Sequence, residues 1–153
     1  MTEISYRNCT SEEFEAVFRA DHPEHCPWAD FVDVKKASNI YGAEIAGEIR
    51  GAISFEFVSH QVVDEDEQEF TLSYVSFMYV SVRDRGRGIA TNLFSHALRL
   101  LVDAERDPIG CGITSSGAQR VFEKLPLELT RHVRLLPTDF TETGYDIWKE
   151  LGL

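Results

Sequence analysis

The sequence has few cysteines, and they lack the spacings in which cysteines bind metal or form disulfide frameworks. Cys9, Cys26 and Cys111 are the only three in 153 residues, and no CxxC pair occurs. We therefore expect neither a structural disulfide nor a cysteine-based zinc site. His22, His25 and Cys26 lie close together but lack a fourth ligand, so no metal is predicted there. An odd number of thiols suits a reducing compartment, and we expect a cytoplasmic protein.

Long apolar runs and an excess of basic charge are also missing. No stretch approaches the ~20 apolar residues of a membrane-spanning helix, and the opening Met-Thr-Glu-Ile lacks the basic segment of a secretory signal. Lys and Arg number 15 against 26 Asp and Glu, which gives a net charge of −11. Neither a membrane nor a nucleic acid is thus an expected partner, because nucleic-acid binding depends on clustered Lys and Arg. An acidic protein would instead attract a cationic substrate or a basic partner.

No repeat, low-complexity segment or linker rich in proline and glycine divides the chain. We expect residues 1–153 to form one domain. A domain of this length buries roughly two thirds of the surface that its unfolded chain exposes, so it can fold without metal or disulfide.

Helices are predicted where apolar residues recur every three or four positions. Thr10-Ser-Glu-Glu13 has the pattern of a capping box, and the helix that it opens ends at Pro23. After Gly88, apolar pairs recur every four residues to about Glu105, which predicts a strongly amphipathic helix. Two shorter helices are predicted at residues 28–37 and 116–125.

Strands are predicted where apolar residues alternate with polar ones. Residues 41–45 and 53–57 alternate around a turn at 47–51 and predict a hairpin, and the acidic run 64–69 predicts a solvated connection. Residues 70–82 carry apolar and aromatic side chains on both faces, as expected of a central strand. Short strands are further predicted at 4–7, 111–114, 132–136 and 144–148.

The segment Met78–Phe94 carries the clearest functional signal. It leads from the central strand through Gly86 and Gly88 directly into a helix. Glycines let a ligand approach the backbone, and the first turn of a helix offers unpaired N–H groups and a partial positive charge. The turn also concentrates positive charge on Arg83, Arg85 and Arg87. A phosphate-bearing ligand explains both features.

Two common nucleotide motifs do not fit this segment. There is no GxxxxGK[ST] sequence, which excludes a P-loop, and Thr91 stands where a dinucleotide-binding fold has its third glycine.

The sequence instead resembles the GNAT superfamily of acyl-CoA-dependent N-acyltransferases. The family signature is Gln or Arg, two residues of any type, Gly, one residue, then Gly or Ala. Arg85-Gly-Arg-Gly88-Ile-Ala90 meets it, preceded by the apolar strand Met78-Tyr-Val80. Downstream, Ala118–Leu125 resembles the family segment Ala-x-x-Leu-Tyr-Glu-Lys-Leu, with Phe122 in place of the tyrosine. The predicted element order matches that family over nearly the whole chain. The resemblance implies a single α/β (α+β) domain whose mostly antiparallel central sheet of about six or seven strands is flanked by helices.

The same resemblance implies a binding site for acetyl-CoA, the expected co-substrate, and no metal. The backbone N–H of Met78 would polarise the acetyl carbonyl, and backbone groups of Tyr79 and Val80 would bond the pantetheine. Ser115 would face the pantetheine, and Phe122 would line the CoA channel. The pyrophosphate would be held by backbone N–H groups of Arg85, Gly86, Arg87, Gly88, Ile89, Ala90 and Thr91, together with the Thr91 hydroxyl.

The implied chemistry is direct attack of a neutral amine on the thioester, with the oxyanion held by the N–H of Met78. A base is needed, because an alkyl amine with a pKa of about 10 is mostly protonated at neutral pH. Some relatives place a glutamate where this sequence has Tyr74, whose phenol is a poor base at pH 7. We expect Glu56 on the neighbouring strand to serve as the catalytic base, ahead of Glu69 or a water chain through Ser76.

The predicted function is acetyl-CoA-dependent N-acetylation of a primary amine, and the net negative charge favours a small cationic molecule as acceptor. One alternative is a protein acetyltransferase that modifies a lysine or an N-terminal amine. An alternative of another class is a non-catalytic acyl-CoA-binding module, since Phe122 and Tyr74 replace the usual acid and base of the family. The sequence leaves a homodimer open.

Overall fold

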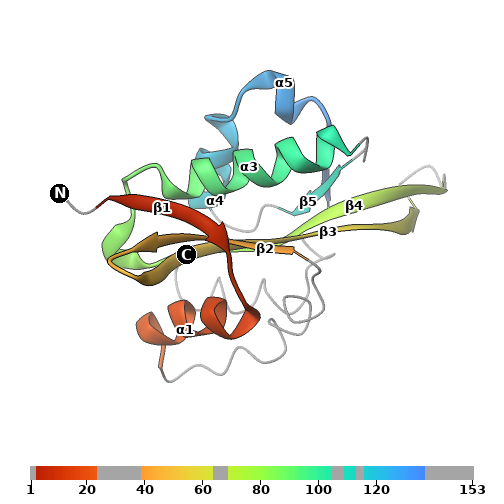
Figure 1. The fold of residues 1–153 in the computed structure, drawn as a ribbon. Coiled ribbons are helices and arrows are strands. Elements are labelled where there is room, and N and C mark those ends of the chain that lie inside the picture. The colour runs from red at the N-terminus through yellow and green to blue at the C-terminus, as the bar shows by residue number, and fades with distance from the viewer. Residues whose placement is uncertain (1–2, 24–38, 64–68, 105–108, 113–115, 137–153) are drawn as a thin grey trace.

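A computed structural model describes residues 3–23, 39–63, 69–104, 109–112 and 116–136. At residues 56–63, 69–74, 76–77, 110, 112, 116 and 134–136 it describes the backbone alone. The described strands form one six-stranded sheet in the order β1-β2-β3-β4-β5-β6 (Figure 1). Their bounds are β1 Ile4–Asn8, β2 Asn39–Ile45, β3 Glu48–Val63, β4 Glu69–Val80, β5 Ile109–Gly112 and β6 Val133–Leu136.

The sheet has an antiparallel part and a parallel part. Strands β1 to β4 pair antiparallel, whereas β5 runs parallel to β4 and β6 parallel to β5. The α+β class expected from the sequence is therefore confirmed, with β4 inside the sheet between β3 and β5. The expected strand at 144–148 and the expected helix at 28–37 lie outside the described residues.

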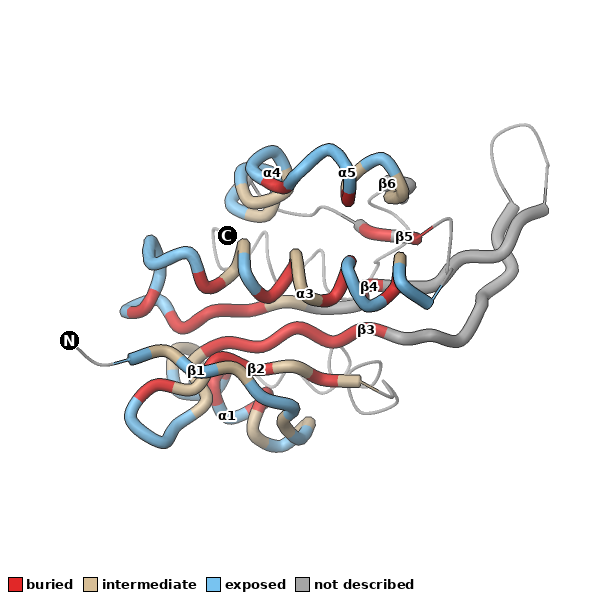
Figure 2. The backbone as a smooth tube through the Cα atoms, turned by 45° about the horizontal axis from the view of Figure 1, so that its top comes forward, coloured by how far each residue is buried: buried red, intermediate tan, exposed pale blue. Residues whose placement is uncertain are grey.

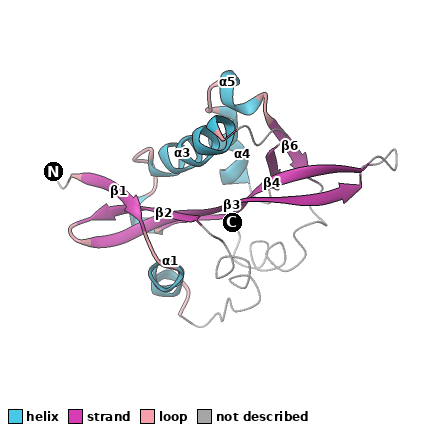
Figure 3. Ribbon diagram, turned by 45° about the vertical axis from the view of Figure 1, so that its right-hand side comes forward, coloured by secondary structure: helices cyan, strands magenta, loops and turns pink. Residues whose placement is uncertain are grey.

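Helices cover both faces of the sheet. Helix α1 (Ser11–Asp21) packs on one face, and α3 (Ile89–Asp103) lies across the other with α4 (Ser116–Glu123) and α5 (Leu127–Thr130) beside it (Figures 1 and 3). Buried residues lie along the first half of β3, near the end of β4 and on α3 (Figure 2). The larger core lies between α3 and the sheet, and a smaller one joins α1 to the opposite face. None of the helices in the described ranges has the length and apolar character that crossing a bilayer requires.

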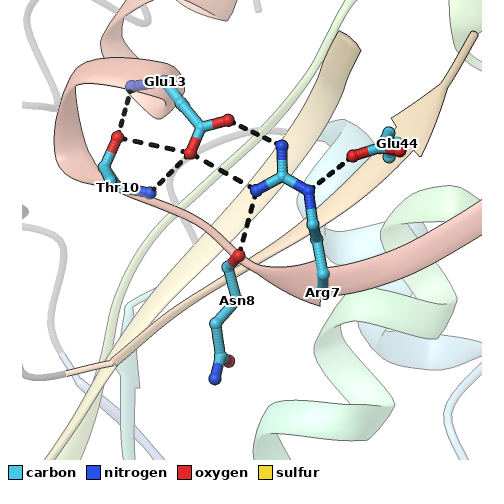
Figure 4. Close-up of polar contacts among 5 residues, drawn as sticks. All are labelled: Arg7, Asn8, Thr10, Glu13 and Glu44. Carbon is cyan, nitrogen blue, oxygen red and sulfur yellow. Dashed lines mark hydrogen bonds and ion pairs between the residues drawn. The ribbon is translucent and has the colours of Figure 1, made fainter. Parts of the chain in front are cut away.

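The start of α1 is stabilised by its sequence neighbours. The Thr10 hydroxyl accepts a hydrogen bond from the Glu13 N–H at 3.1 Å, and the Thr10 N–H donates to the Glu13 carboxylate at 3.1 Å (Figure 4). This reciprocal pair is the predicted capping box. The Arg7 guanidinium on β1 contacts Glu13 at 2.7 Å and also pairs with Glu44 on β2. One arginine thus connects two strands to the beginning of the helix.

The structure corrects several predicted boundaries. The hairpin turn lies at Ala46 and Gly47 instead of at 47–51, and both residues have positive φ. Two central residues with positive φ give a two-residue turn whose twist matches that of the flanking strands. Strand β5 (Ile109–Gly112) begins two residues before the predicted start at 111, and residues 113–114 lie outside the described residues. Strand β4 ends at Val80, and the short 3-10 helix η1 (Val82–Asp84) follows it. Helix α5 was not predicted, since four residues directly after a proline carry no periodic signal.

Candidate active site

The first feature of the site is a gap in the pairing between β4 and β5. The register joins Ser73–Val75 of β4 to Ile109–Cys111 of β5 and stops there. On its other side, β4 stays paired with β3 as far as Val80. Among the residues that the structure describes, the last part of β4 therefore has a neighbouring strand on one side only.

A β-bulge lies where the pairing ends. Ser54 is opposite Phe77 and Phe55 is opposite Val75, so Ser76 is an extra residue in β4. An extra residue bends its strand and increases the local twist. The bulge thus lies directly after Val75, the last residue of β4 whose pairing with β5 the structure describes.

The hydrogen-bond pattern shows which backbone groups face this gap. The Ser81 N–H donates to the Arg50 carbonyl of β3 at 2.8 Å. Because backbone groups alternate along a strand, those of Tyr79 also face β3, and those of Met78 and Val80 face the β5 side. Met78 and Val80 therefore direct their backbone groups away from β3, whereas the backbone groups of Tyr79, for which a contact with pantetheine was expected, face β3.

The Tyr79 side chain lies on the opposite face of the sheet, against α1. Its hydroxyl donates to the Asp21 carboxylate at 2.8 Å and lies 3.0 Å from Nε2 of His22. Burial, followed by the Asp21 carboxylate, raises the pKa of the Tyr79 phenol, which stays protonated at neutral pH. The same Asp21 oxygen accepts the Val82 N–H at 2.9 Å. Tyr79 therefore connects the end of α1 to the end of β4.

The second feature of the site is the beginning of α3. Gly86 and Gly88 have φ values of 80° and 79°, a left-handed conformation that favours glycine. Gly88 is the N-cap residue, and no side chain caps the helix. The first bond of the helix runs from the Asn92 N–H to the Gly88 carbonyl at 3.0 Å. The N–H groups of residues 89–91 consequently have no acceptor within the helix, which is the arrangement of an anion site.

The three arginines of the turn differ in the groups that they contact. Arg85 is folded back, with Nε donating to the Val80 carbonyl at 3.1 Å and the guanidinium 5.3 Å above the Tyr79 ring. Its own N–H lies 3.4 Å from the Val82 carbonyl, in a turn of the backbone. Arg83 and Arg87 have side chains that are 67% and 38% exposed, and both lie near the Asp84 carboxylate. All three arginines are exposed residues, and Arg85 is in addition bonded to the end of β4.

Three proposed residues outside the turn are described less completely. The backbone of Glu56 lies in β3 opposite Tyr74. Glu69 is the first residue of β4, opposite Val63. Ser115 lies outside the described residues.

Phe122 belongs to the packed side of α4. Its side chain is half-buried against the larger core, and its ring centroid lies 6.1 Å from that of Phe94 on α3. Phe122 supplies no hydroxyl that could protonate a leaving group.

Nucleophilic thiols are not prepared among the described residues. Burial raises the pKa of the Cys9 thiol to about 11 and that of Cys111 to about 12. A thiol needs to ionise to act as a nucleophile. Both described thiols therefore stay protonated at neutral pH.

Arg50 and Asp84 were missed by the sequence analysis. Asp84, in η1, is 6% exposed, and its carboxylate lies 3.2 Å from Nη1 of Arg50 at the beginning of β3. The two residues are far apart in the chain, and no local pattern links them.

The comparisons with known proteins agree with this architecture. The family model described as the acetyltransferase (GNAT) family matches residues 5–125. A similar solved structure is a GCN5-related N-acetyltransferase from Kribbella flavida, with a TM-score of 0.58 and 17% identity, covering 79% of this chain and 32% of that one. The chain thus spans about a third of the length of the Kribbella protein. No curated protein matches the chain.

Two further structures were solved with acetyl-CoA. A predicted acetyltransferase from Clostridium acetobutylicum is 16% identical, with a TM-score of 0.55 over 80% of this chain and 88% of that one. A GNAT family acetyltransferase from Brucella melitensis is 22% identical, with a TM-score of 0.53 over 71% of this chain and 73% of that one. At these identities the likeness shows a common fold.

Proposed function

Because the chain belongs to the acetyltransferase (GNAT) family, we propose that it transfers the acetyl group of acetyl-CoA to a primary amine. The observation that carries this proposal is the gap between β4 and β5 next to the uncapped N-terminus of α3. The gap suits an extended, amide-containing chain, and the helix terminus suits a phosphate group. Acetyl-CoA carries both, and its presence in two structures of similar fold supports the assignment.

In this proposal the pantetheine arm lies along β4 as an additional strand. The carbonyl of Met78 and the N–H of Val80 bond the arm, since the Val80 carbonyl already accepts from Arg85. The N–H of Met78 is left for the acetyl carbonyl. The pyrophosphate binds at the turn from Gly86 to Thr91, where the backbone supplies N–H donors and the Thr91 hydroxyl adds another. Ser115 and Phe122 complete the CoA channel.

The amine attacks the thioester carbonyl directly. A C–N bond forms, the C–S bond breaks, and the amine proton passes to a base. The N–H of Met78 stabilises the oxyanion. We assign the base to Glu56, whose backbone is adjacent to β4, with Glu69 or a water chain through Ser76 as alternatives. The CoA thiolate leaves without a phenol donor because Phe122 occupies that position. With a thiol pKa of about 8.5 it is an acceptable leaving group.

The acceptor in this proposal is a small cationic amine, because the chain carries a net charge of −11. A lysine side chain or an N-terminal amine of a protein is the alternative acceptor. Electrostatic attraction to the acidic protein would act on either kind of cationic acceptor, so an experiment has to test small amines and lysine-containing peptides together.

A second candidate is a non-catalytic acyl-CoA-binding module. The half-buried Phe122 favours it, because the usual proton donor to the thiolate is missing there. In that case the gap and the turn would bind acyl-CoA without transfer.

Thiol release from acetyl-CoA separates these candidates. The purified protein is incubated with acetyl-CoA alone, with a panel of small amines and with lysine-containing peptides, and liberated CoA is measured with a thiol reagent. We expect release that depends on a cationic amine, with the acetylated amine identified by mass spectrometry. Acetyl-CoA binding without release for any acceptor would favour the binding module, and absence of acetyl-CoA binding would contradict the proposed function altogether.

A further inference from the structure

The turn before α3 contains a buried carboxylate, which is unusual for a site that binds anions. Asp84 lies two residues before Gly86 and is 6% exposed. A negative charge beside a pyrophosphate opposes binding unless another group neutralises it. The partners of Asp84 therefore bear directly on how the turn works.

The carboxylate of Asp84 is paired with three arginines. Oδ2 accepts a hydrogen bond from Nη1 of Arg50 at 3.2 Å, and Oδ1 lies 3.5 Å from Nη1 of Arg87. Nε of the exposed Arg83 lies farther away, 3.9 Å from Oδ2. The Arg50 side chain is largely buried, at 18% exposed, and its Nε lies 3.3 Å from the Glu48 carboxylate. Asp84 thus links the beginning of β3 to an arginine of the turn that leads into α3.

Two further contacts attach the turn to the same part of β3. The Arg50 carbonyl accepts the Ser81 N–H at 2.8 Å. At the next residue, Gly51, an added Cβ would lie 3.1 Å from Cγ2 of Val80 and 3.3 Å from Cγ2 of Ile89. Gly51 therefore lets β3 approach both the end of β4 and the first residue of α3. The beginning of β3 therefore lies against the turn at Asp84 and at the two ends of the turn, Val80 and Ile89.

We propose that Arg50 is a positioning residue for CoA binding, which acts through Asp84. The pair holds η1 against β3 and keeps the Arg87 guanidinium beside the N-terminus of α3, while Arg50 neutralises the carboxylate. This inference rests on the proposed function, in which the turn binds the pyrophosphate of CoA. Arg50 itself is not required to touch the ligand.

A double-mutant cycle tests the proposal, with CoA as the probe and isothermal calorimetry as the measurement. The variants are Arg50→Met, Asp84→Asn and the double variant. Arg99→Met is the matched control, because Arg99 lies in an exposed pair with Glu128 on α5 and its loss changes the net charge equally. We expect Arg50→Met to raise the Kd for CoA at least tenfold, and Arg99→Met to change it less than twofold.

The double variant distinguishes action through Asp84 from direct contact with CoA. If Arg50 acts through Asp84, the double variant binds CoA more tightly than Arg50→Met alone, because the carboxylate that has lost its buried arginine partner is gone. Additive losses would mean that Arg50 contacts CoA itself and would overturn the inference. Equal Kd values for Arg50→Met and Arg99→Met would also overturn the inference.

Calorimetry also separates positioning from a general loss of folding. Partial unfolding lowers the binding stoichiometry, whereas loss of positioning raises the Kd of the folded fraction. A reduced stoichiometry with an unchanged Kd would overturn the inference. If Arg50→Met does not fold, Arg50→Lys replaces it, because lysine keeps the charge and loses the planar fork of arginine; an unchanged Kd in that folded variant would count equally against the inference. A wild-type protein that does not bind CoA would instead contradict the proposed function.

Discussion

Gly88 is the residue at which local conformation and proposed ligand binding meet. Its φ of 79° is strained for any residue with a side chain, and no heavy atom lies within 4 Å of an added Cβ. We expect Gly88→Glu to weaken CoA binding by about 2 kcal/mol or more, roughly 30-fold, because a carboxylate would occupy the pyrophosphate space and remove charge-assisted hydrogen bonds. Calorimetry with CoA measures the change.

Gly47 provides the matched control for this substitution. It has nearly the same φ, 81°, in the turn between β2 and β3, and an added Cβ there likewise meets nothing within 4 Å. Gly47→Glu introduces the same backbone strain and charge outside the turn before α3, and its CoA affinity should stay within about threefold of wild type, as expected of a distant charge in water. Equal affinities of the two folded variants would contradict the assignment of the pyrophosphate site.

A substitution at Phe122 tests whether the CoA thiolate can leave without a proton from an acidic side chain. Phe122→Tyr adds one hydroxyl at a half-buried position, so CoA binding should be unchanged. We expect turnover to rise if thiolate departure limits the rate and to change little otherwise, because a thiolate with a pKa of about 8.5 leaves acceptably without a proton. Steady-state kinetics with acetyl-CoA and the best acceptor measure this. A wild type that binds acetyl-CoA but acetylates no amine, together with an active Phe122→Tyr variant, would favour the binding module.

Among the elements, α1 owes its beginning to the capping box. Thr10→Ala removes the hydroxyl that accepts the Glu13 N–H, and we expect the free energy of unfolding to fall by about 1 kcal/mol. Ser11→Ala, one residue later, removes a hydroxyl from the first turn of the same helix without removing the cap. Urea unfolding of both variants measures the difference. Equal stabilities of the two variants would mean that the cap contributes nothing measurable.

The elements differ in how well the sequence predicts them. The hairpin of β2 and β3 and helix α3 were predicted because each has a sustained period of two or of three to four residues. The central strand β4 was predicted because apolar residues occur on both of its faces. The end of β4 and the start of β5 were misplaced, since they depend on pairing between distant strands. The bulge at Ser76 carries no local signal at all, because it is defined by the partner residues Ser54 and Phe55.

The site was predicted only where it is local in sequence. Gly86 and Gly88 predict the turn as a binding site, because two glycines between a strand and a helix are typical of anion sites. Arg50 and Asp84 could not be paired from the sequence, since 34 residues separate them and only the fold brings them to 3.2 Å. For Arg85, the sequence shows the positive charge, but it does not show that the side chain folds back onto the Val80 carbonyl.

At the scale of the whole molecule, the layered fold holds the two proposed parts of the CoA site in register. Strand β4 contributes the backbone groups that face the gap, and α3 contributes its N-terminus at Ile89, nine residues after β4 ends at Val80. On the opposite face, Asp21 at the end of α1 bonds both Tyr79 and the Val82 N–H. The connection between β4 and α3 is therefore held from both sides of the sheet.

The net charge of −11 is also a property of the whole chain, and it predicts how the proposed acceptor binds. Charges on an exposed surface act over a Debye length of about 8 Å at physiological salt, so added salt weakens the attraction of a cationic amine. We expect the KM for the amine to rise with ionic strength, while the KM for acetyl-CoA rises less or falls, because the anionic cofactor is repelled by the overall charge. Initial rates at increasing sodium chloride, with a cationic amine and a neutral amine of similar size, provide the test. If the KM for the amine does not change with salt and the neutral amine is used equally well, the acceptor is selected by shape and local contacts, and the charge argument is wrong.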